Sequence, residues 1–433
     1  MIWDIQHECM DREQLQSLQL LRLKETVHRV YEHVPYYRRL FDEHGIRPAD
    51  VQGLEDVAKL PFTTKTALRD NYPYGLFAMP MNKIVRLHAS SGTTGKPTVV
   101  GYSQRDLDTW SDLVARVACQ AGVTADDVVQ ITFGYGLFTG AFGLHYGLEK
   151  VGATIVPASV GNTERQIMLM QDFNTTALVG TPSYCLHLAE AAVGMGIDPA
   201  SLNIRVGLYG SEAWTESMRN ELEKAWGAKA TDNFGLSEIM GPGVAGECTI
   251  ESGLHINEDH FLVEVIDPET GKPLDYGEEG ELVITTLTKE ALPIIRYRTR
   301  DITVLNPQKC ACGRTTVRMR KVMGRTDDML IISGVNVFPS QIETVLMDID
   351  GTTPHYKIIV DKKGYLDYLE VQVELTDEMF TGAFRDLEAL ERRIKERMRS
   401  VLQINAKVRL LEPRSLERST GKVKRVFDYR QEK

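Results

Sequence analysis

The sequence predicts a large α/β unit followed by a small α+β unit. From Ile84 onward, short apolar runs alternate with longer amphipathic segments, which is typical of a domain with largely parallel strands. After Asp328 the expected order becomes hairpin, helix, strand, strand, helix and strand. The length of 433 residues leaves room for more than one domain, at roughly 100–200 residues each. We therefore expect residues 1–324 to form the large unit and residues 325–433 the small one.

The large unit is expected to have three successive parts. Leucine and valine recur at helical spacing between Leu15 and Val27, so the N-terminal part is expected to be mostly helical. In the α/β core that follows, the clearest strands and helices are expected at Val128–Thr132, Thr163–Phe173, Ala177–Val179 and Thr215–Trp226. From about Leu254 the chain becomes rich in β-forming residues. This texture predicts a β subdomain with strands at Phe261–Ile266, Gly280–Thr286 and Asp301–Leu305.

The small unit is expected to span about 105 residues, a common domain size. It should open with a hairpin at Met329–Val337 and a helix from Ser340. Its strands are expected at Tyr356–Val360, Tyr368–Leu375 and Lys407–Leu411. A long helix between the last two strands should present one apolar face, because apolar residues recur there at spacings of three and four. They are Phe384, Leu387, Leu390, Ile394, Met398 and Val401.

Composition and charge exclude several classes of function. The net charge is −10, so no overall basic field favours nucleic acid or an anionic membrane. No apolar run approaches the ~18 residues of a membrane helix, and the polar, acidic N-terminus lacks the pattern of a signal peptide. The 6 cysteines do not indicate a disulfide framework. We expect a cytoplasmic protein without nucleic-acid or membrane partners.

The segment Ser90–Thr98, SSGTTGKPT, has the composition of a phosphate-binding loop. Small residues let backbone N–H groups approach phosphate oxygens, hydroxyls donate further hydrogen bonds, and Lys96 adds a positive charge. The segment is not a Walker A loop, because Ser90 and Pro97 occupy positions where that motif has Gly and Ser or Thr. A flexible linker is the alternative interpretation. Further motifs downstream favour phosphate binding.

Those motifs occur in a fixed order along the chain. They are YGSE (Tyr209–Glu212) with DNFGLSE (Asp232–Glu238), YRTRD (Tyr297–Asp301), GRTDDMLIISGVNVFPSQIE (Gly324–Glu343) and STGKVKR (Ser419–Arg425). With them the chain resembles the phenylacetate–CoA ligase family of the adenylate-forming acyl-CoA synthetases, over nearly its whole length. The resemblance implies a large adenylate-forming N-terminal domain, a small mobile C-terminal domain and a homodimer.

The resemblance also implies a two-step reaction. An aryl acid would attack the α-phosphorus of MgATP to give acyl-AMP and pyrophosphate, and the thiol of coenzyme A would then release AMP. Catalysis of the first step would be charge stabilisation by Mg²⁺, Lys96 and Lys422. Because Lys422 must leave before coenzyme A enters, the small domain would rotate about a hinge at Asp327.

Each motif residue takes a role from the resemblance. The loop that would close over the β- and γ-phosphates comprises Ser90, Ser91, Gly92, Thr93, Thr94, Gly95 and Lys96. Adenine would lie among Ser211, Glu212, Asp232, Asn233 and Phe234. The hydroxyl of Ser237 would meet the α-phosphate, and Glu238 would hold Mg²⁺, a hard ion that takes oxygen ligands. Asp301 would accept hydrogen bonds from the ribose hydroxyls, Arg325 would meet ribose or phosphate, and Gly334 would leave room for the pantetheine chain of coenzyme A.

The acyl pocket is expected in the segment Phe133–Gly143, which is rich in aromatic residues and glycine. This segment resembles the one that lines the aryl pocket in the family. The candidates for contact with the acid are Tyr135, Phe138, Phe142 and Gly210. Ordinary core aromatics are the alternative. An apolar pocket of this kind predicts a preference for aryl acetates over acetate.

Four residues outside these motifs suit a metal. Cys310 and Cys312 form a close pair of soft ligands, and Cys248 and His255 lie in the preceding β-rich region. A Cys₃His set fits tetrahedral zinc, in a structural role because four protein ligands leave no open position. Four unrelated residues are the alternative.

Two other functions stay open at this point. One is an adenylating enzyme of the same superfamily with another acid or acceptor, such as the deazaflavin-adenylylating relatives. The other is a nucleotide-binding protein without catalysis, against which the presence of both Glu238 and Lys422 speaks. The identity of the aryl acid is also open among phenylacetate, a hydroxyphenylacetate, indoleacetate and another aryl acid.

Overall fold

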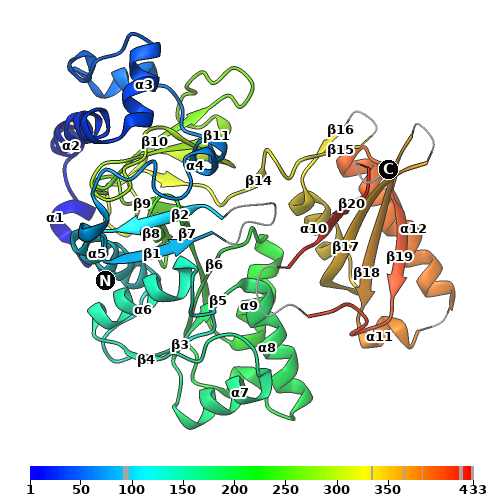
Figure 1. Ribbon diagram of the computed structural model, residues 1–433. Coiled ribbons are helices and arrows are strands. Elements are labelled where there is room, and N and C mark those ends of the chain that lie inside the picture. Colours follow the sequence, from blue (N-terminus) through cyan, green and yellow to red (C-terminus); the bar gives the residue numbers. More distant parts are fainter. Residues whose placement is uncertain (91–96, 333–334, 364–365, 383, 419–422, 431–433) are drawn as a thin grey trace.

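The computed structural model describes residues 1–433 apart from 91–96, 333–334, 364–365, 383, 419–422 and 431–433. Figure 1 shows a large unit, blue to yellow, beside a smaller C-terminal unit, gold to red. The buried apolar side chains form two clusters in the large unit and one in the C-terminal unit. The predicted combination of an α/β unit with a small α+β unit is confirmed.

The large unit is built on a 12-stranded sheet. Its parallel strands are β3 (Val128–Ile131), β4 (Thr154–Val156), β5 (Ala177–Gly180), β6 (Val206–Gly210) and β7 (Lys229–Leu236). Antiparallel strands continue it: β8 (Gly241–Glu247), β9 (Leu254–Ile256), β10 (Phe261–Ile266), β11 (Glu279–Thr286), β12 (Tyr297–Asn306), β13 (Arg318–Met319) and β14 (Gly324–Arg325). The β-rich segment is therefore not a separate sheet, because β9 and β13 join it to β8 of the core.

Helices cover both faces of the parallel strands. Alternate side chains of a strand point to opposite faces, and Val179 of β5 accordingly packs into one cluster and Leu178 into another. The first cluster includes residues of α5 (Gln104–Ala121) and α6 (Thr139–Val151); the second includes residues of α8 (Pro182–Gly194) and α9 (Glu216–Trp226). Between them in sequence lies α7 (Thr163–Asp172). Because α5 begins at a capping box of Ser103 and Asp106 and ends at Gly122 in the left-handed conformation, both its ends are defined by sequence.

The N-terminal part is mostly helical, as predicted. It contains α1 (Ile5–Glu8), α2 (Arg12–His33), α3 (Pro35–Glu43) and α4 (Lys65–Asp70), with short 3-10 turns at Pro48–Asp50, Leu54–Lys59 and Met81–Lys83. The antiparallel pair of β1 (Arg86–Ala89) and β2 (Val99–Tyr102) follows. Ser90 and Thr98 close the base of the segment between these strands, since the Ser90 N–H donates to the Thr98 carbonyl at 2.9 Å.

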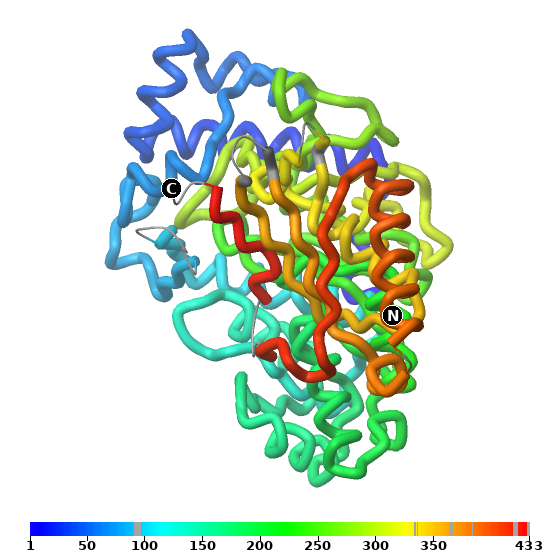
Figure 2. The backbone as a smooth tube through the Cα atoms, turned by 90° about the vertical axis from the view of Figure 1, so that its right-hand side faces the viewer, coloured from blue at the N-terminus to red at the C-terminus, as the bar shows by residue number. Residues whose placement is uncertain are grey.

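The C-terminal unit is a four-stranded sheet with helices against it. Its strand order is β19-β18-β17-β20, formed by β17 (Thr352–Lys363), β18 (Leu366–Leu375), β19 (Lys407–Leu411) and β20 (Val426–Asp428). Figure 2 looks onto this sheet, with β20 in red at one edge. The other elements are β15 (Leu330–Ile332), β16 (Val335–Val337), α10 (Pro339–Met347), α11 (Asp377–Phe380) and α12 (Phe384–Leu402). On α12, Leu390, Ile394 and Met398 are buried as the spacing predicts, whereas Phe384 and Val401 at its ends are exposed.

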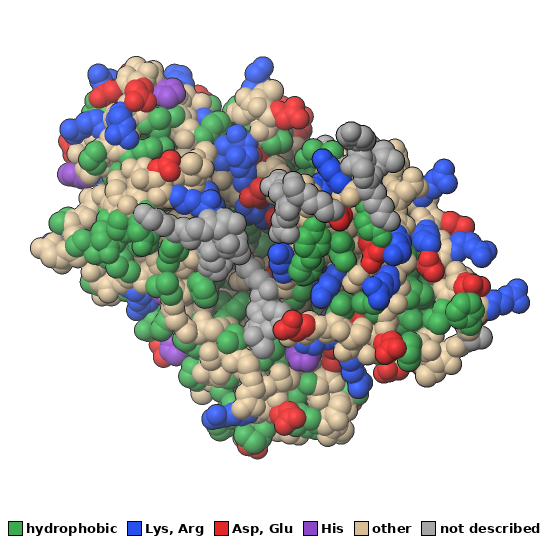
Figure 3. Space-filling view, turned by 45° about the vertical axis from the view of Figure 1, so that its right-hand side comes forward, with side chains coloured by type: hydrophobic (Ala, Val, Ile, Leu, Met, Phe, Trp, Pro, Cys, Tyr) green, Lys and Arg blue, Asp and Glu red, His purple; other side chains and the backbone are tan. Residues whose placement is uncertain are grey.

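Polar contacts join the two units. The Glu190 carboxylate on α8 accepts from His355 Nε2 at 2.7 Å and lies 3.4 Å from Arg418 Nε. Thr215 at the start of α9 donates its hydroxyl hydrogen to Glu343 of α10 at 3.2 Å. Charged side chains of both signs are interspersed over the face of the molecule in Figure 3. Among the described residues, no helix is long and apolar enough to cross a membrane.

Candidate active site

A cavity of about 780 Å³ lies where the parallel strands end and the C-terminal unit begins. Its walls come from segments far apart in sequence, including the loop after β3, the ends of β6 and β7, strand β12, and residues of the C-terminal unit as late as Val423. Ligands of open α/β sheets bind at the carboxyl ends of the strands. Eleven predicted site residues line this one cavity: Ser90, Phe138, Ser211, Glu212, Asp232, Asn233, Phe234, Ser237, Glu238, Asp301 and Arg325.

Ser211 and Glu212 leave the end of β6 in an unusual conformation. Ser211 has a φ of 71°, in the left-handed region that costs a residue with a side chain. The Glu212 carboxylate accepts a hydrogen bond from the Ser183 N–H at 2.8 Å, at the start of α8. Burial raises the pKa of Glu212, while Ser183 and the Arg425 guanidinium oppose the shift. The strained turn thus holds a half-buried carboxyl group at the cavity wall.

Residues at the end of β7 line the cavity, and one of them also forms a hydrogen bond that ties β7 to β6. The Asn233 side-chain amide donates to the Tyr209 carbonyl at 2.7 Å, which fixes its orientation between β6 and β7. Burial raises the pKa of Asp232 to about 6, against the opposing charge of Lys321. Phe234 is half-buried and presents a ring at the cavity. This wall suits a flat, partly polar ring such as a nucleobase.

Ser237 and Glu238 lie in the tight connection between β7 and β8. The Ser237 hydroxyl is 2.8 Å from that of Thr139, the first residue of α6. Glu238 is buried, yet it borders the cavity. A carboxylate in this position fits a hard cation such as Mg²⁺, which prefers oxygen ligands.

Asp301 on β12 has one engaged and one unengaged oxygen. Oδ1 accepts from Arg325 Nη1 at 3.0 Å, whereas buried Oδ2 has no hydrogen-bond partner in the described part of the chain. Burial raises the pKa of Asp301 to about 6, although Arg325 opposes the shift. Arg325 in turn contacts both oxygens of Asp327 at 2.9 and 3.0 Å. An unengaged acceptor at the cavity wall suits a ligand that donates hydroxyl hydrogens.

Several predicted residues lie outside the described part of the chain. They are Ser91, Gly92, Thr93, Thr94, Gly95 and Lys96 of the phosphate loop, Gly334, and Lys422. The described neighbours of the phosphate loop and of Lys422 do border the cavity, since Ser90 precedes the loop and Val423 follows Lys422. The roles of these eight residues stay predictions.

The predicted acyl-pocket residues are placed differently from one another. Phe138 lines the cavity, but Tyr135 and Phe142 are not among its lining residues. Tyr135 and Phe142 stack edge to face at 5.3 Å, and the Tyr135 hydroxyl lies 3.0 Å from His145 Nδ1. A Cβ on Gly210 would lie 2.5 Å from the Asn233 carbonyl oxygen, so close packing of β6 against β7 requires this glycine.

Sequence reasoning missed other lining residues. Trp214, Tyr297 and Lys321 border the cavity, and Lys321 Nζ lies 3.7 Å from the centre of the Trp214 ring. Each lies inside a predicted motif or within three residues of one. This proximity is the sequence signal that could have identified them. Lys321 also forms a 2.9 Å ion pair with Glu216. These residues add an aromatic face and a positive charge to the wall.

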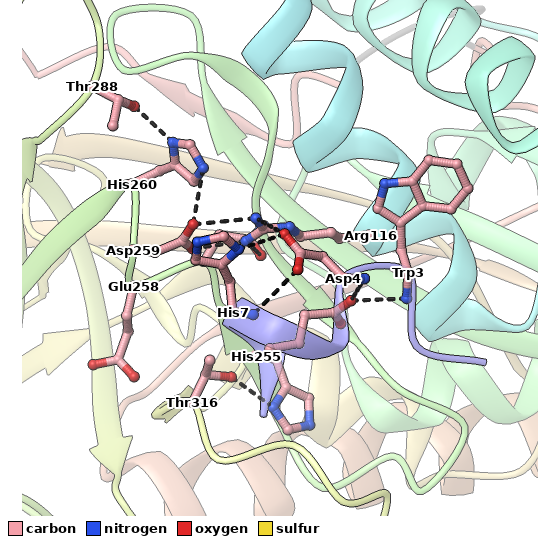
Figure 4. Close-up of polar contacts among 12 residues, drawn as sticks. Trp3, Asp4, His7, Arg116, His255, Glu258, Asp259, His260, Thr288 and Thr316 are labelled. Atoms are coloured by element: carbon pink, nitrogen blue, oxygen red, sulfur yellow. Dashed lines mark hydrogen bonds and ion pairs between the residues drawn. The ribbon is translucent and has the colours of Figure 1, made fainter. Parts of the chain in front are cut away.

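The four candidate metal ligands converge away from this cavity. The ligand atoms of Cys248, His255, Cys310 and Cys312 all lie within 4.8 Å of one another. The pairing of β9 with β13 brings the two halves together, with His255 opposite Arg318. Figure 4 shows the His255 ring beside Thr316, whose hydroxyl lies 3.1 Å from Nδ1.

Comparisons with known proteins define the class. The model of the AMP-binding enzyme family matches residues 48–287, and that of the AMP-binding enzyme C-terminal domain matches residues 334–430. The structure is similar to a 2-hydroxyisobutyryl-CoA ligase in the postadenylation state with 2-HIB-AMP, with a TM-score of 0.93, 28% identity, and coverage of 98% of this chain and 91% of that one. For the same ligase with 2-HIB-AMP and CoA in the thioesterification state, the TM-score is 0.72, at 29% identity and coverage of 98% and 92%.

Two curated relatives narrow the class. A phenylacetate–coenzyme A ligase of Aromatoleum evansii is 50% identical, over 98% of this chain and 96% of its own length. That of Escherichia coli strain K12 is 49% identical, over 98% and 97%. The chain therefore belongs to the phenylacetate–coenzyme A ligase family of AMP-binding enzymes, and it is an acid–thiol ligase.

Proposed function

We propose that this chain joins phenylacetate, or a related aryl acid, to coenzyme A at the expense of ATP through an acyl-AMP intermediate. The observation that carries the proposal is the convergence of residues from every predicted nucleotide motif, as far as the structure describes them, on one cavity. The presence of both Glu238 and Lys422 speaks against a nucleotide-binding protein without catalysis. The test is release of AMP that requires both phenylacetate and coenzyme A. Release of AMP with another acceptor in place of coenzyme A would favour the alternative, a different adenylating enzyme.

The residues divide the work of nucleotide binding. The wall of Phe234, Asn233 and Ser211 accommodates adenine, and the unengaged Asp301 oxygen accepts from the ribose. Glu238 holds Mg²⁺, which supplies positive charge beside the phosphates when bound. The acid is positioned next to Phe138 and Phe133, where apolar side chains border the cavity. Lys96 and Lys422 supply further positive charge during adenylation.

The small C-terminal domain rotates between the two steps. The higher similarity to the postadenylation state than to the thioesterification state supports an adenylation-side arrangement for this structure. Strand β14 pairs Arg325 with Asp301, so Arg325 stays attached to the sheet of the large unit. The Thr326 N–H also donates to the Arg300 carbonyl at 2.8 Å. The backbone pairing with β12 therefore ends just before Asp327, which supports Asp327 as the hinge and a domain boundary close to 324/325. A homodimer and a cytoplasmic location stay predictions; light scattering of the purified chain tests the former.

The Cys₃His cluster holds a structural zinc ion. With Zn–S of about 2.3 Å and Zn–N of about 2.0 Å, tetrahedral geometry would place two sulfurs about 3.8 Å apart and a sulfur and nitrogen about 3.5 Å apart. Cys248 and Cys310 are 3.8 Å apart at Sγ, and Cys312 Sγ is 3.4 Å from His255 Nε2. The Thr316 contact with Nδ1 orients the ring, as partners of metal-binding histidines do. The loop also anchors the N-terminus, because Arg314 donates to the Met1 carbonyl at 2.7 Å.

Elemental analysis of protein purified without added metal tests the zinc site. We expect close to one zinc per chain, because structural sites bind with ~10–16 kcal/mol. Cys312→Ser should lose the metal and lower the melting temperature, whereas Cys185→Ser, which removes a buried thiol elsewhere, should keep the metal. Less than about 0.2 zinc per chain in the unaltered protein would exclude the site, given that affinity.

A further inference from the structure

Lys289 is a buried cation close to the active site that no motif includes. It is among the largest fully buried side chains of the molecule, at 2% exposure. Lysine is rarely fully buried unless its charge is paired. Within the described residues, no carboxylate forms an ion pair with Lys289, and the charges of Asp106 and Glu238 act on it at longer range. A lysine kept in such a place needs an explanation other than stability.

The contacts of Lys289 are to the backbone of the turn that carries Glu238. Its ammonium group donates to the Ile239 carbonyl at 2.8 Å and to the Glu238 carbonyl at 3.3 Å. Two aromatic side chains continue this pattern along the turn. The Tyr102 hydroxyl donates to the Met240 carbonyl at 3.1 Å, and Trp110 Nε1 donates to the Pro242 carbonyl at 2.8 Å.

The donors themselves are fixed. Tyr102 stacks on Trp110 with ring centres 4.9 Å apart, and Lys289 Nζ lies 4.8 Å from the centre of the Tyr102 ring. Asp106 accepts from the backbone N–H groups of Glu290 and Ala291 at 2.7 and 3.0 Å. Thr288, which precedes Lys289 in the chain, is also held: Figure 4 shows its hydroxyl beside His260, 2.7 Å from Nδ1.

We propose that Lys289 is a positioning residue for the metal-binding step: it holds the backbone of the 238–242 turn so that the Glu238 carboxylate faces the cavity. The proposal rests on the proposed function, because it concerns the carboxylate assigned to Mg²⁺. The contacts of the Lys289 ammonium group with the Ile239 and Glu238 carbonyls support this role. The direction in which replacing Lys289 changes cation binding at Glu238 distinguishes a positioning role from a purely electrostatic one. Removing a nearby positive charge would by itself favour a cation at Glu238, whereas losing the backbone anchor weakens that site.

The test compares Lys289→Met with Lys59→Met, which removes a lysine from the exposed surface. For Lys289→Met we expect the Mg²⁺ concentration at half-maximal ATP–pyrophosphate exchange to rise about tenfold. Thioester formation from supplied acyl-AMP should stay within twofold of the unaltered enzyme. Binding of Mn²⁺ in the presence of ATP, followed by electron paramagnetic resonance, should weaken by the same factor without any turnover. Lys59→Met should change none of these quantities.

Two outcomes overturn the proposal: an unchanged or tighter metal dependence, or equal losses in both half-reactions. If Lys289→Met fails to fold, Lys289→Arg replaces it, because the larger guanidinium keeps the charge but displaces the turn. The same weakening of Mn²⁺ binding is then expected, and its absence overturns the proposal. Absence of exchange in the unaltered enzyme with every aryl acid would instead contradict the proposed function.

Discussion

Asp301 is a carboxyl group to which we assign a role in both the fold and ligand binding. Arg325 donates to Oδ1, and Oδ2, which has no hydrogen-bond partner among the described residues, is the oxygen that we propose accepts from the ribose. Its pKa of about 6 lies above the usual 3.8, so the folded protein favours the protonated form. The contribution to stability is therefore complete below pH 3.8 and is lost as the pH rises through 6.

Asp301→Asn tests both consequences. The variant should bind ATP on the order of 10- to 100-fold more weakly, because hydrogen bonds to a charged acceptor contribute about 1.5–3 kcal/mol each. Its unfolding free energy should also vary less between pH 4 and 6 than that of the unaltered protein. Isothermal titration and urea unfolding measure these two quantities. Unchanged ATP affinity would remove Asp301 from the nucleotide site.

Replacing Lys422 should affect the two half-reactions differently. Lys422→Ala should slow adenylation on the order of 10²-fold or more, comparable to the loss of one preorganised donor. Thioester formation from supplied acyl-AMP should be largely retained. Lys424→Ala, two positions further on and exposed, is the matched control. Equal losses in both halves for Lys422→Ala would contradict domain rotation.

At the scale of elements, α12 shows what periodicity can predict. Its apolar face is buried at the middle, where Ile394 is 0% exposed, and open at the end, where Val401 is 50% exposed. Ile394→Ala should lower the free energy of unfolding by 2–5 kcal/mol, roughly, because it leaves a cavity. Val401→Ala should change it by less than about 0.5 kcal/mol. If Ile394→Ala and Val401→Ala lowered the free energy of unfolding in urea by similar amounts, α12 would pack through a different face.

The local spacing of apolar residues predicted most helices and strands. The strands that it did not predict are defined by pairing with distant parts of the chain. β10 and α9 lie where their apolar patterns placed them, but β20 has three residues and exists only through its parallel pairing with β17. The β-rich segment was expected as a β subdomain attached to the α/β core, but the sequence does not show that β13 pairs with β9 and so joins both parts into one sheet.

The same distinction applies to the site. The roles of Glu238 and Asp301 could be predicted because both residues stand in motifs that the chain shares with the family, and a carboxylate suits the chemistry expected at each position. An aromatic run does not reveal which rings face a cavity, so Phe138 could not be separated from Tyr135 and Phe142. Lys289 was overlooked because its contacts are to carbonyl groups, which leave no mark on the sequence.

At the scale of the molecule, Glu190 connects the large unit to the C-terminal one. It contacts His355 and Arg418, and Arg418 is also held by Glu374 at 2.8 Å. Burial raises the pKa of Glu190, but hydrogen bonds from His187 and His355 and the Arg418 charge outweigh it, so the net shift is downward. The contact is therefore complete above the usual carboxyl range and is lost as the pH falls below it.

Glu190→Gln should destabilise this arrangement of the units. We expect adenylation to slow several-fold and thioester formation to be unchanged or faster, because the population shifts away from the adenylation side. Glu164→Gln on α7, an exposed position, is the control. Stopped-flow measurement of each half-reaction separates the two effects. A loss confined to thioester formation would assign this contact to the other step.

The account depends most on the acyl-AMP intermediate, and a single-turnover experiment tests it directly. Enzyme in excess is mixed with ATP labelled in the adenosine and with phenylacetate, quenched, and analysed before and after addition of coenzyme A. We predict that phenylacetyl-AMP accumulates on the enzyme first, and that coenzyme A converts it to phenylacetyl-CoA with stoichiometric AMP. Formation of ADP, or phenylacetyl-AMP that coenzyme A leaves unchanged, would contradict the account.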